Sequence, residues 1–138
     1  MSYAVFLPGK NKQFQGDQLL KEIKEGINIE FDESKDEELQ KVTSLLKEKI
    51  NAKSILLTLS GKGICINSEN GFVHTPAYGG SVIDVSGAGD TVIAVLSMAL
   101  VANGNFEESA QLANLAAGIV VGKVGTATVT TEEIFSLL

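Results

Sequence analysis

Hydrophobic residues in the first part of the chain form two patterns, a helical repeat and a short continuous run. From Ser34 onward, apolar residues recur every three or four positions, which predicts a helix that buries one face, and Ser34 with Glu37 has the spacing of a capping box. Residues 17–26 have a similar helical spacing. Residues 3–7 form a short apolar run that stops at Pro8, as a strand entering a turn would. The pattern therefore predicts a strand and two helices in this part of the chain.

Three short runs of β-forming residues follow, at 54–60, 63–67 and 71–77. Gly-Lys-Gly and Glu-Asn-Gly sequences separate these runs and are typical of turns. The first run is apolar without alternation, which indicates a strand covered on both faces. The other two runs are predicted to form a hairpin.

Helical spacing dominates the rest of the chain. A strand-like run at residues 82–85 leads into a predicted helix from about 89 to 103. Asn105 is predicted to cap a second helix that runs to about 121, residues 122–130 are expected to form a loop and a short strand, and Thr131 is expected to open a terminal helix. Because helices and strands alternate, the sequence predicts an α/β fold with a mainly parallel sheet, flanked by helices and carrying a β-hairpin.

Composition narrows the range of partners and locations. The 138 residues are 44% hydrophobic, which suits one domain over residues 1–138, and a net charge of −6 without a basic cluster argues against nucleic acid or an anionic membrane as a partner. The longest mostly apolar run, residues 92–102, is about half as long as a bilayer requires. Cys65 is the single cysteine and is expected to be a buried, unreactive thiol, and His74 is expected to be structural or exposed. Without a paired cysteine or a charged-then-apolar leader, we expect a cytoplasmic protein.

The segment "VIDVSGAGDTVIAVL", residues 82–96, places three small residues directly before Asp90 and an apolar helix. A helix begins with N–H groups that have no partner inside the helix, and small residues let a large anion approach them, so this segment predicts a phosphate-binding site. Two roles for Asp90 remain open from the spacing. It either complements the helix dipole, or it is ionised to accept a hydroxyl proton beside a bound phosphoryl group.

Two other phosphate-binding motifs do not fit this segment. A Walker loop requires Gly-Lys-Ser/Thr after its glycines, and the chain has none. The dinucleotide fingerprint requires glycine where Val92 stands.

With its flanking residues, "DVSGAGDTVIA" resembles the second signature of the ribokinase-like (PfkB) carbohydrate kinases. Before this signature, "LLTLSGKGICI" resembles the nucleotide-side strand and turn of that family, and after it "LANLAAGIVVGKVGT" resembles its adenine-side helix and loop, in the family's order. Within the family, "VSGAGDTVI" and "GKVGTATVT" are most similar to heptose-phosphate kinases. The resemblance covers residues 53–131 and implies a ribokinase-like fold, incomplete relative to the full family fold.

The resemblance also implies roles for individual residues. Asp90 would be the catalytic base, and Gly87, Ala88 and Gly89 would form the anion hole for the transferred phosphoryl group. The implied nucleotide-binding residues are Thr58, Gly61, Gly63 and Asn114. The residues at the position where some members bind a monovalent cation are Asp84, Ser86, Val120, Lys123 and Gly125.

The implied activity is ATP-dependent phosphoryl transfer to a hydroxyl of a small-molecule sugar or sugar phosphate, with Mg²⁺ and, in some members, K⁺. The match corresponds to the C-terminal, nucleotide-binding half of the family, so we expect the sugar-binding N-terminal half and its β lid to be absent. The family has an Asn-x-x-Glu motif, in which this chain keeps the glutamate as Glu22 but has Leu19 in place of the asparagine. The alternative is therefore a catalytically silent nucleotide-binding or assembly module. Because missing strands leave a sheet edge or apolar face uncovered, we also expect a homo-oligomer.

Overall fold

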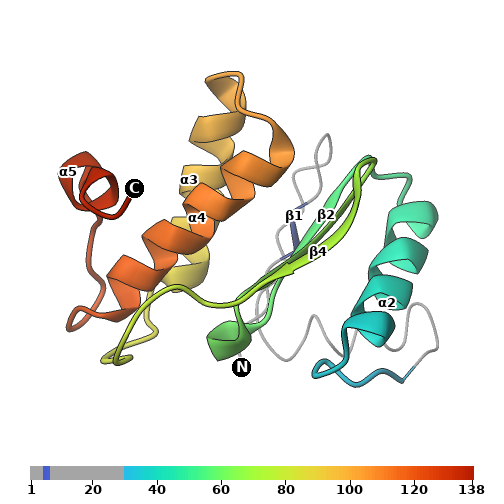
Figure 1. Cartoon of the computed structure of the whole chain (residues 1–138), viewed down its shortest axis with the longest axis horizontal. Helices are drawn as coiled ribbons and strands as arrows, with labels where there is room; N and C mark the ends of the chain where they lie inside the picture. Colours follow the sequence, from blue (N-terminus) through green and yellow to red (C-terminus); the bar gives the residue numbers. More distant parts are fainter. Residues whose placement is uncertain (1–4, 7–29) are drawn as a thin grey trace. The chain divides into compact units, whose positions relative to one another are not determined.

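The computed structural model describes residues 5–6 and 30–138, which form two compact units. We call Met1–Pro76 the sheet unit and Ala77–Leu138 the helical unit. The first contains β1 (Val5–Phe6), α2 (Asp36–Lys49), β2 (Ile55–Thr58), the 3₁₀ helix η1 (Ser60–Lys62), β3 (Ile64–Ser68) and β4 (Gly71–Thr75). The second contains α3 (Ala88–Val101), α4 (Phe106–Val121) and α5 (Thr131–Phe135) (Figure 1).

The sheet has the strand order β1-β2-β3-β4, and every strand pair in it is antiparallel. The predicted hairpin of residues 63–77 is confirmed as β3 and β4, with Cys65 opposite His74. The expectation of a mainly parallel sheet is not met in the described residues. Residues 59–63 join β2 to β3, and Glu69 and Asn70 join β3 to β4. Connections this short join antiparallel neighbours, because a parallel pair requires a crossover of a dozen residues or more.

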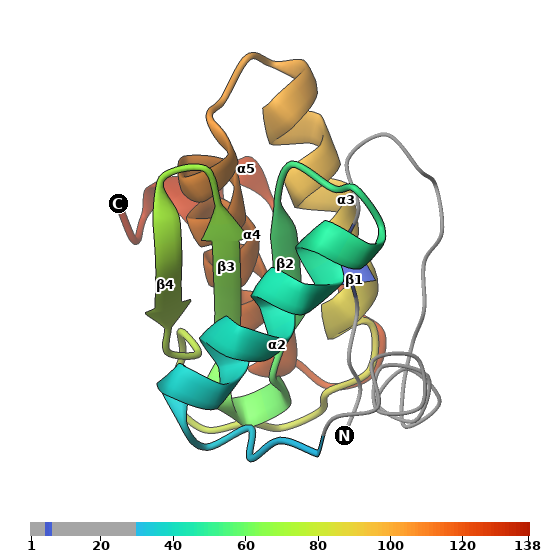
Figure 2. The same cartoon turned by 90° about the vertical axis from the view of Figure 1, so that its right-hand side faces the viewer.

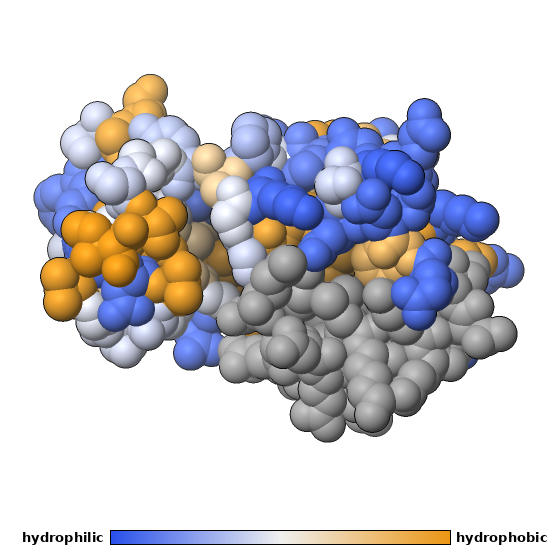
Figure 3. Space-filling model, turned by 90° about the horizontal axis from the view of Figure 1, so that it is seen from below, coloured by the Kyte–Doolittle hydropathy of each residue, from blue (hydrophilic) through white to orange (hydrophobic). Residues whose placement is uncertain are grey.

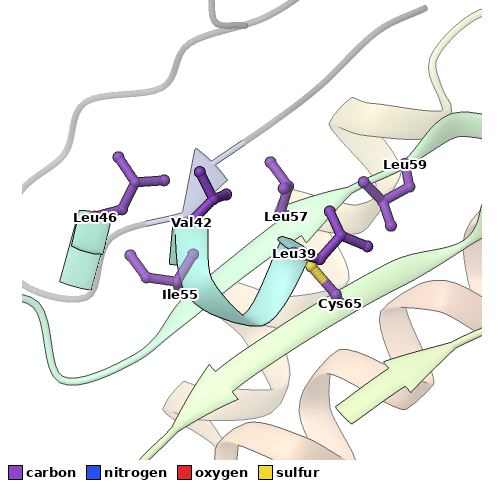
Figure 4. Packing of buried hydrophobic residues seen from close by; sticks show 7 residues of the cluster. All are labelled: Leu39, Val42, Leu46, Ile55, Leu57, Leu59 and Cys65. Carbon is purple, nitrogen blue, oxygen red and sulfur yellow. The ribbon is translucent and has the colours of Figure 1, made fainter. Parts of the chain in front are cut away.

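Helix α2 covers one face of this sheet (Figure 2). Its apolar stripe lies against alternate residues of β2 and against β3, as Figure 4 shows from close by. The buried cluster consists of Leu39, Val42, Leu46, Ile55, Leu57, Leu59 and Cys65. The Cys65 thiol is fully buried, as predicted, and burial above all raises its pKa to about 12. Continuous burial of β2 confirms that this strand is covered on both faces.

The start of α2 differs from the sequence prediction. Ser34 and Glu37 form no capping box, because the helix begins one residue later than they require, with Lys35 as its N-cap. Ser34 instead donates its N–H and its hydroxyl to Asp32, and the Asp32 N–H donates to the Glu38 carboxylate. Asp32 and Glu38 therefore order the turn before α2, and no side chain caps the helix. The predicted helix at residues 17–26 lies outside the described residues.

Helices α3 and α4 pack against each other and form the body of the helical unit (Figure 1). Asn105 accepts the Glu108 N–H at 2.8 Å and caps α4, as predicted. Helix α5 begins at Thr131, as expected, and Thr130 and Glu133 form a capping box at its start. Among the residues that the structure describes, no helix is long and apolar enough to cross a membrane.

Two predicted strands in the helical unit are absent. Residues 127–130 are irregular, and so are residues 82–85. The N–H groups of Ile83 and Asp84 both donate to the Val121 carbonyl, at 2.8 and 3.1 Å, rather than to a strand. The side chains of Val82, Ile83 and Val85 are 58–65% exposed, so the apolar run that predicted a strand is not buried on either side.

A glycine of α4 lets the preceding loop pass close to the helix. A Cβ on Gly118 would lie 2.0 Å from the Tyr78 carbonyl oxygen, which is far inside van der Waals contact. Only glycine therefore permits the loop to cross α4 here. This crossing holds the segment that leads into α3.

Candidate phosphoryl-transfer site

The small-residue segment forms the N-terminus of α3. Gly87 is the N-cap residue in the left-handed conformation, with φ 80° and ψ −2°, and the helix begins at Ala88. The Gly87 carbonyl accepts both the N–H of Thr91, at 2.9 Å, and its hydroxyl, at 3.0 Å. Asp90 is the third residue of the helix, and its side chain is exposed. The first turn is thus closed by hydrogen bonds, with a carboxylate at its surface beside the N–H groups of the helix end.

Gly87 also lies close to a second segment. A Cβ at this position would lie 3.3 Å from Cγ2 of Thr126, in addition to the strain of a positive φ. The loop of residues 122–130 therefore passes beside the start of α3.

Asp84 connects the same two segments through its carboxylate. Oδ1 accepts the Ser86 N–H at 2.9 Å, and Oδ2 accepts the Gly125 N–H at 3.1 Å. The Ser86 N–H, followed by the Ser86 hydroxyl and the Gly125 N–H, holds the pKa of Asp84 below its usual value. Asp84 is consequently ionised near neutral pH and links the approach to α3 with the loop after α4.

Lys123 and Glu133 tie that loop to α5. The Lys123 ammonium donates to the Thr128 carbonyl at 2.7 Å and forms an ion pair with Glu133 at 2.6 Å. Glu133 also accepts the Thr130 N–H, and its pKa is lowered, first by Lys123 and then by Thr130. These contacts fix the loop from both ends.

The residues expected to bind a monovalent cation fall in one region of the helical unit. Hydrogen bonds join Asp84 to Ser86 and Gly125, and the Lys123 N–H donates to the Val120 carbonyl at 3.0 Å. In the described part of the chain no three His, Cys, Asp or Glu side chains cluster as a metal site. A site built from main-chain carbonyls and one carboxylate is a different kind of site and stays a prediction.

Three of the four expected nucleotide-binding residues lie together in the sheet unit. Thr58 ends β2 and is buried, while Gly61 and Gly63 belong to the turn between β2 and β3. The turn is closed by the Leu59 N–H, which donates to the Gly63 carbonyl at 2.7 Å, and Gly63 has φ 95°. Asn114, the fourth residue, is buried on α4 in the other unit.

One histidine has contacts that the sequence did not indicate. Nδ1 of His74 bonds to the Asp36 carboxylate, and Nε2 lies 3.0 Å from the Lys62 carbonyl oxygen, inside the turn that carries Gly61 and Gly63. Asp36 is 38 residues away in sequence, so no local pattern could have revealed this contact. The Leu19 and Glu22 positions lie outside the described residues.

The model of the pfkB family of carbohydrate kinases matches residues 13–133 of this sequence. The chain belongs to this family. A similar protein, the bifunctional protein HldE of Nitratiruptor sp., is 40% identical over 96% of this chain, which covers 29% of that relative. HldE of Geobacter sulfurreducens is 44% identical over 85% of the chain, which covers 23% of that protein. The chain thus spans less than a third of the length of these relatives.

Solved structures confirm the ribokinase-like fold of this pfkB-family chain. It superposes on a ribokinase from Thermotoga maritima with a TM-score of 0.70 and 22% identity, over 86% of this chain and 37% of the ribokinase. Ribokinase of Arabidopsis thaliana, solved with ribose and ATP, gives a TM-score of 0.72 at 21% identity, over 85% of this chain and 38% of that one. Phosphofructokinase-2 of Escherichia coli, solved with potassium, gives a TM-score of 0.72 at 17% identity, over 84% of this chain and 37% of that one.

Proposed function

We propose that this pfkB-family chain carries the phosphoryl-transfer site of a kinase that uses ATP to phosphorylate a hydroxyl of a sugar or sugar phosphate. The observation that carries the proposal is the placement of Asp90, an exposed carboxylate in the first turn of α3, directly after the left-handed Gly87. A heptose phosphate is the acceptor that the sequence resemblance implies.

Asp90 acts as the base in this proposal. Its carboxylate takes the proton of the acceptor hydroxyl as the hydroxyl oxygen bonds to the γ-phosphorus of ATP and the bond to the β-phosphate oxygen breaks. The proton ends on Asp90, and the products are a phosphate ester and ADP. The positive end of the helix dipole favours the ionised carboxylate that this step requires.

The N-terminus of α3 stabilises the negative charge on the transferred group. The first N–H groups of a helix have no partner within it, and those of Ala88, Gly89 and Asp90 are the first three in α3. The Ala88 N–H donates to the Val85 carbonyl before the helix at 3.3 Å, a long contact that a phosphoryl oxygen would replace. Such donors reduce the barrier because they are already oriented toward the oxygens on which charge accumulates. The absence of side chains at Gly87 and Gly89 leaves room for the phosphoryl group.

The donor chemistry of the chain suits the cofactors that the family implies. Mg²⁺ neutralises phosphate charge and is held mostly by the substrate phosphates and water, with one or two carboxylates, so no dense acidic cluster is required. Asp84 has accepting capacity beyond the two N–H groups that it binds, and with nearby carbonyls it offers the all-oxygen ligands that suit K⁺. Asp84, Ser86 and the carbonyls of Val120, Lys123 and Gly125 would hold such a cation.

Calorimetry with ATP, ADP and Mg²⁺ on this chain tests nucleotide binding, and an ADP-release assay with a panel of sugars and heptose phosphates tests turnover. We expect ATP binding and acceptor-dependent ADP release by the whole gene product. Absence of nucleotide binding at millimolar concentration would contradict the proposal. Binding without ADP release would favour the alternative, a catalytically silent nucleotide-binding or assembly module.

We also propose that the chain self-associates as a homo-oligomer. Large apolar side chains of the helical unit are exposed, and Figure 3 shows apolar surface grouped on the face of this unit that it displays. Exposed apolar patches of this kind mark interaction sites. Light scattering that finds a monodisperse monomer would disprove self-association.

A further inference from the structure

His74 of β4 is bonded on both sides of its ring to groups that are far from it in sequence. Nδ1 bonds to Oδ1 of Asp36, the first residue of α2, and Nε2 lies 3.0 Å from the carbonyl oxygen of Lys62 in η1. The His74 side chain is 21% exposed, whereas that of Asp36 is 62% exposed. The imidazole thus spans from a helix start to the turn between β2 and β3.

The chemistry of the two partners determines how many protons the ring carries. A carbonyl oxygen only accepts hydrogen bonds, so Nε2 must donate to Lys62. An ionised carboxylate also only accepts, so Nδ1 must donate to Asp36. The contacts are therefore both satisfied only by the doubly protonated imidazolium.

Two residues of the turn that His74 contacts have positive φ values. Ser60 has φ 52° and Gly63 has φ 95°. Within the turn, the Lys62 N–H donates to the Leu59 carbonyl at 3.0 Å and the Gly63 N–H to the Ser60 carbonyl at 3.1 Å. A bond from outside the turn to the Lys62 carbonyl restricts the rotation of the peptide plane between Lys62 and Gly63.

We propose that His74 is a positioning residue that fixes the turn of residues 59–63 in the conformation that contacts the nucleotide. This inference rests on the proposed function in one respect, the binding of ATP by Gly61 and Gly63. His74 touches no reacting group and acts through the turn. Nε2 donates to the Lys62 carbonyl, and the bond of Nδ1 to Asp36 holds the orientation of the ring.

The charged and titratable groups around His74 are few in the described residues. Helix α2 contributes the Asp36 carboxylate, and the following Glu37 and Glu38 lie in the same first turn. The turn contributes the exposed Lys62, and β3 places Cys65 directly opposite His74. Burial above all raises the pKa of Cys65 to about 12, so the thiol stays neutral and adds no charge beside the ring.

Two amide substitutions separate the two contacts of the ring. The amide of glutamine reaches the position of Nε2, so His74→Gln retains a donor to the Lys62 carbonyl and removes the charge. The amide of asparagine corresponds to Nδ1, so His74→Asn retains the contact to Asp36 and loses the one to the turn. Val73→Ala, at the exposed neighbour on the same strand, is the matched control.

We expect His74→Asn to weaken ATP binding by about tenfold in calorimetry, whereas His74→Gln and Val73→Ala retain most of the wild-type affinity. Hydrogen exchange of the Lys62 and Gly63 amides, measured by NMR, should accelerate in His74→Asn and stay near wild type in His74→Gln.

Unchanged amide exchange in His74→Asn would overturn the proposal. Equal losses of ATP affinity in His74→Asn and His74→Gln, with equal losses of Tm, would show that His74 has only a structural role. If the wild-type chain bound no ATP, the proposed function would fail, while amide exchange would still decide whether His74 fixes the turn.

Discussion

The sheet unit and the helical unit are stabilised in different ways. Every residue of β2 and β3 is buried, and α2 adds an apolar stripe to one face of the sheet. In the helical unit, hydrogen bonds accepted by Asp84 and donated by Lys123 hold the segments around the start of α3, while Val82, Ile83 and Val85 are exposed. Burial therefore stabilises the first unit, and polar contacts hold the segments that carry the proposed chemistry. Substitutions should accordingly affect stability in one unit and activity in the other.

The largest expected effect is the loss of activity in Asp90→Asn. Asparagine cannot accept the hydroxyl proton, so kcat should fall by about 10²–10⁴-fold in the ADP-release assay on the whole gene product. Because Asp90 is exposed, the urea unfolding midpoint should stay near wild type. Glu108→Gln, an exposed first-turn acid of α4, is the control and should leave kcat unchanged. A full rate in Asp90→Asn would rule out the base role.

Truncation in the sheet unit should show the opposite result. Leu57→Ala removes a fully buried side chain from the cluster between α2 and the sheet and should lower the free energy of unfolding by about 3 kcal/mol. Val73→Ala, at an exposed position of the same sheet, should change it by less than about 0.5 kcal/mol. Urea denaturation measures both. Similar values for the two variants would mean that burial does not distinguish these positions.

A single methyl group tests whether packing also matters at one point of the helical unit. Gly118→Ala places a Cβ against the Tyr78 carbonyl and should cost about 1–3 kcal/mol, because the loop has to move away from α4. Gly80→Ala, where a Cβ meets open space, is the control. Thermal unfolding compares the two variants. A Gly118→Ala variant as stable as Gly80→Ala would show that the loop does not lie on α4.

The smallest expected effect is a loss of stability in acid. Hydrogen bonds and Lys123 hold the pKa values of Asp84 and Glu133 below their reference values of 3.8 and 4.5. A lowered folded-state pKa contributes stability above the unfolded value, and that contribution disappears as the pH falls through the folded value. We therefore expect the free energy of unfolding to decrease below about pH 4. The decrease should be modest, because both carboxylates lie at the surface.

Glu133→Gln should reduce this acid dependence, which equilibrium unfolding at a series of pH values would detect. Glu132→Gln, at an exposed position on the same helix, serves as the control. An unchanged pH profile in Glu133→Gln would mean that the ion pair to Lys123 does not contribute to the stability of the loop.

Prediction from sequence succeeded where the determining contacts are local. Helical spacing located α2, α3 and α4, and Asn105 caps α4 through a bond to a residue three positions away. The same reasoning failed at residues 82–85, because an apolar run indicates a strand only if other elements bury it. It also failed at Ser34, which bonds to Asp32 and does not cap the helix.

In the candidate site, too, the local features were predicted from the sequence and the long-range contacts were not. The spacing of Gly87 to Asp90 predicted a helix start with an adjacent carboxylate, and the structure places that helix start at Ala88. The link from Asp84 to Gly125 spans 41 residues, and that from His74 to Asp36 spans 38. No periodic pattern encodes contacts across such separations.

The sequence by itself determined the family, the helices and the small-residue segment before Asp90, because these depend on neighbouring residues and on motif spacing. The tertiary structure alone decided the antiparallel order of the described sheet, the irregular course of residues 82–85 and the contacts of His74. The physical reason is that pairing of strands and long-range hydrogen bonds depends on which segments meet after folding. Which groups an imidazole or a carboxylate meets is therefore a property of the fold.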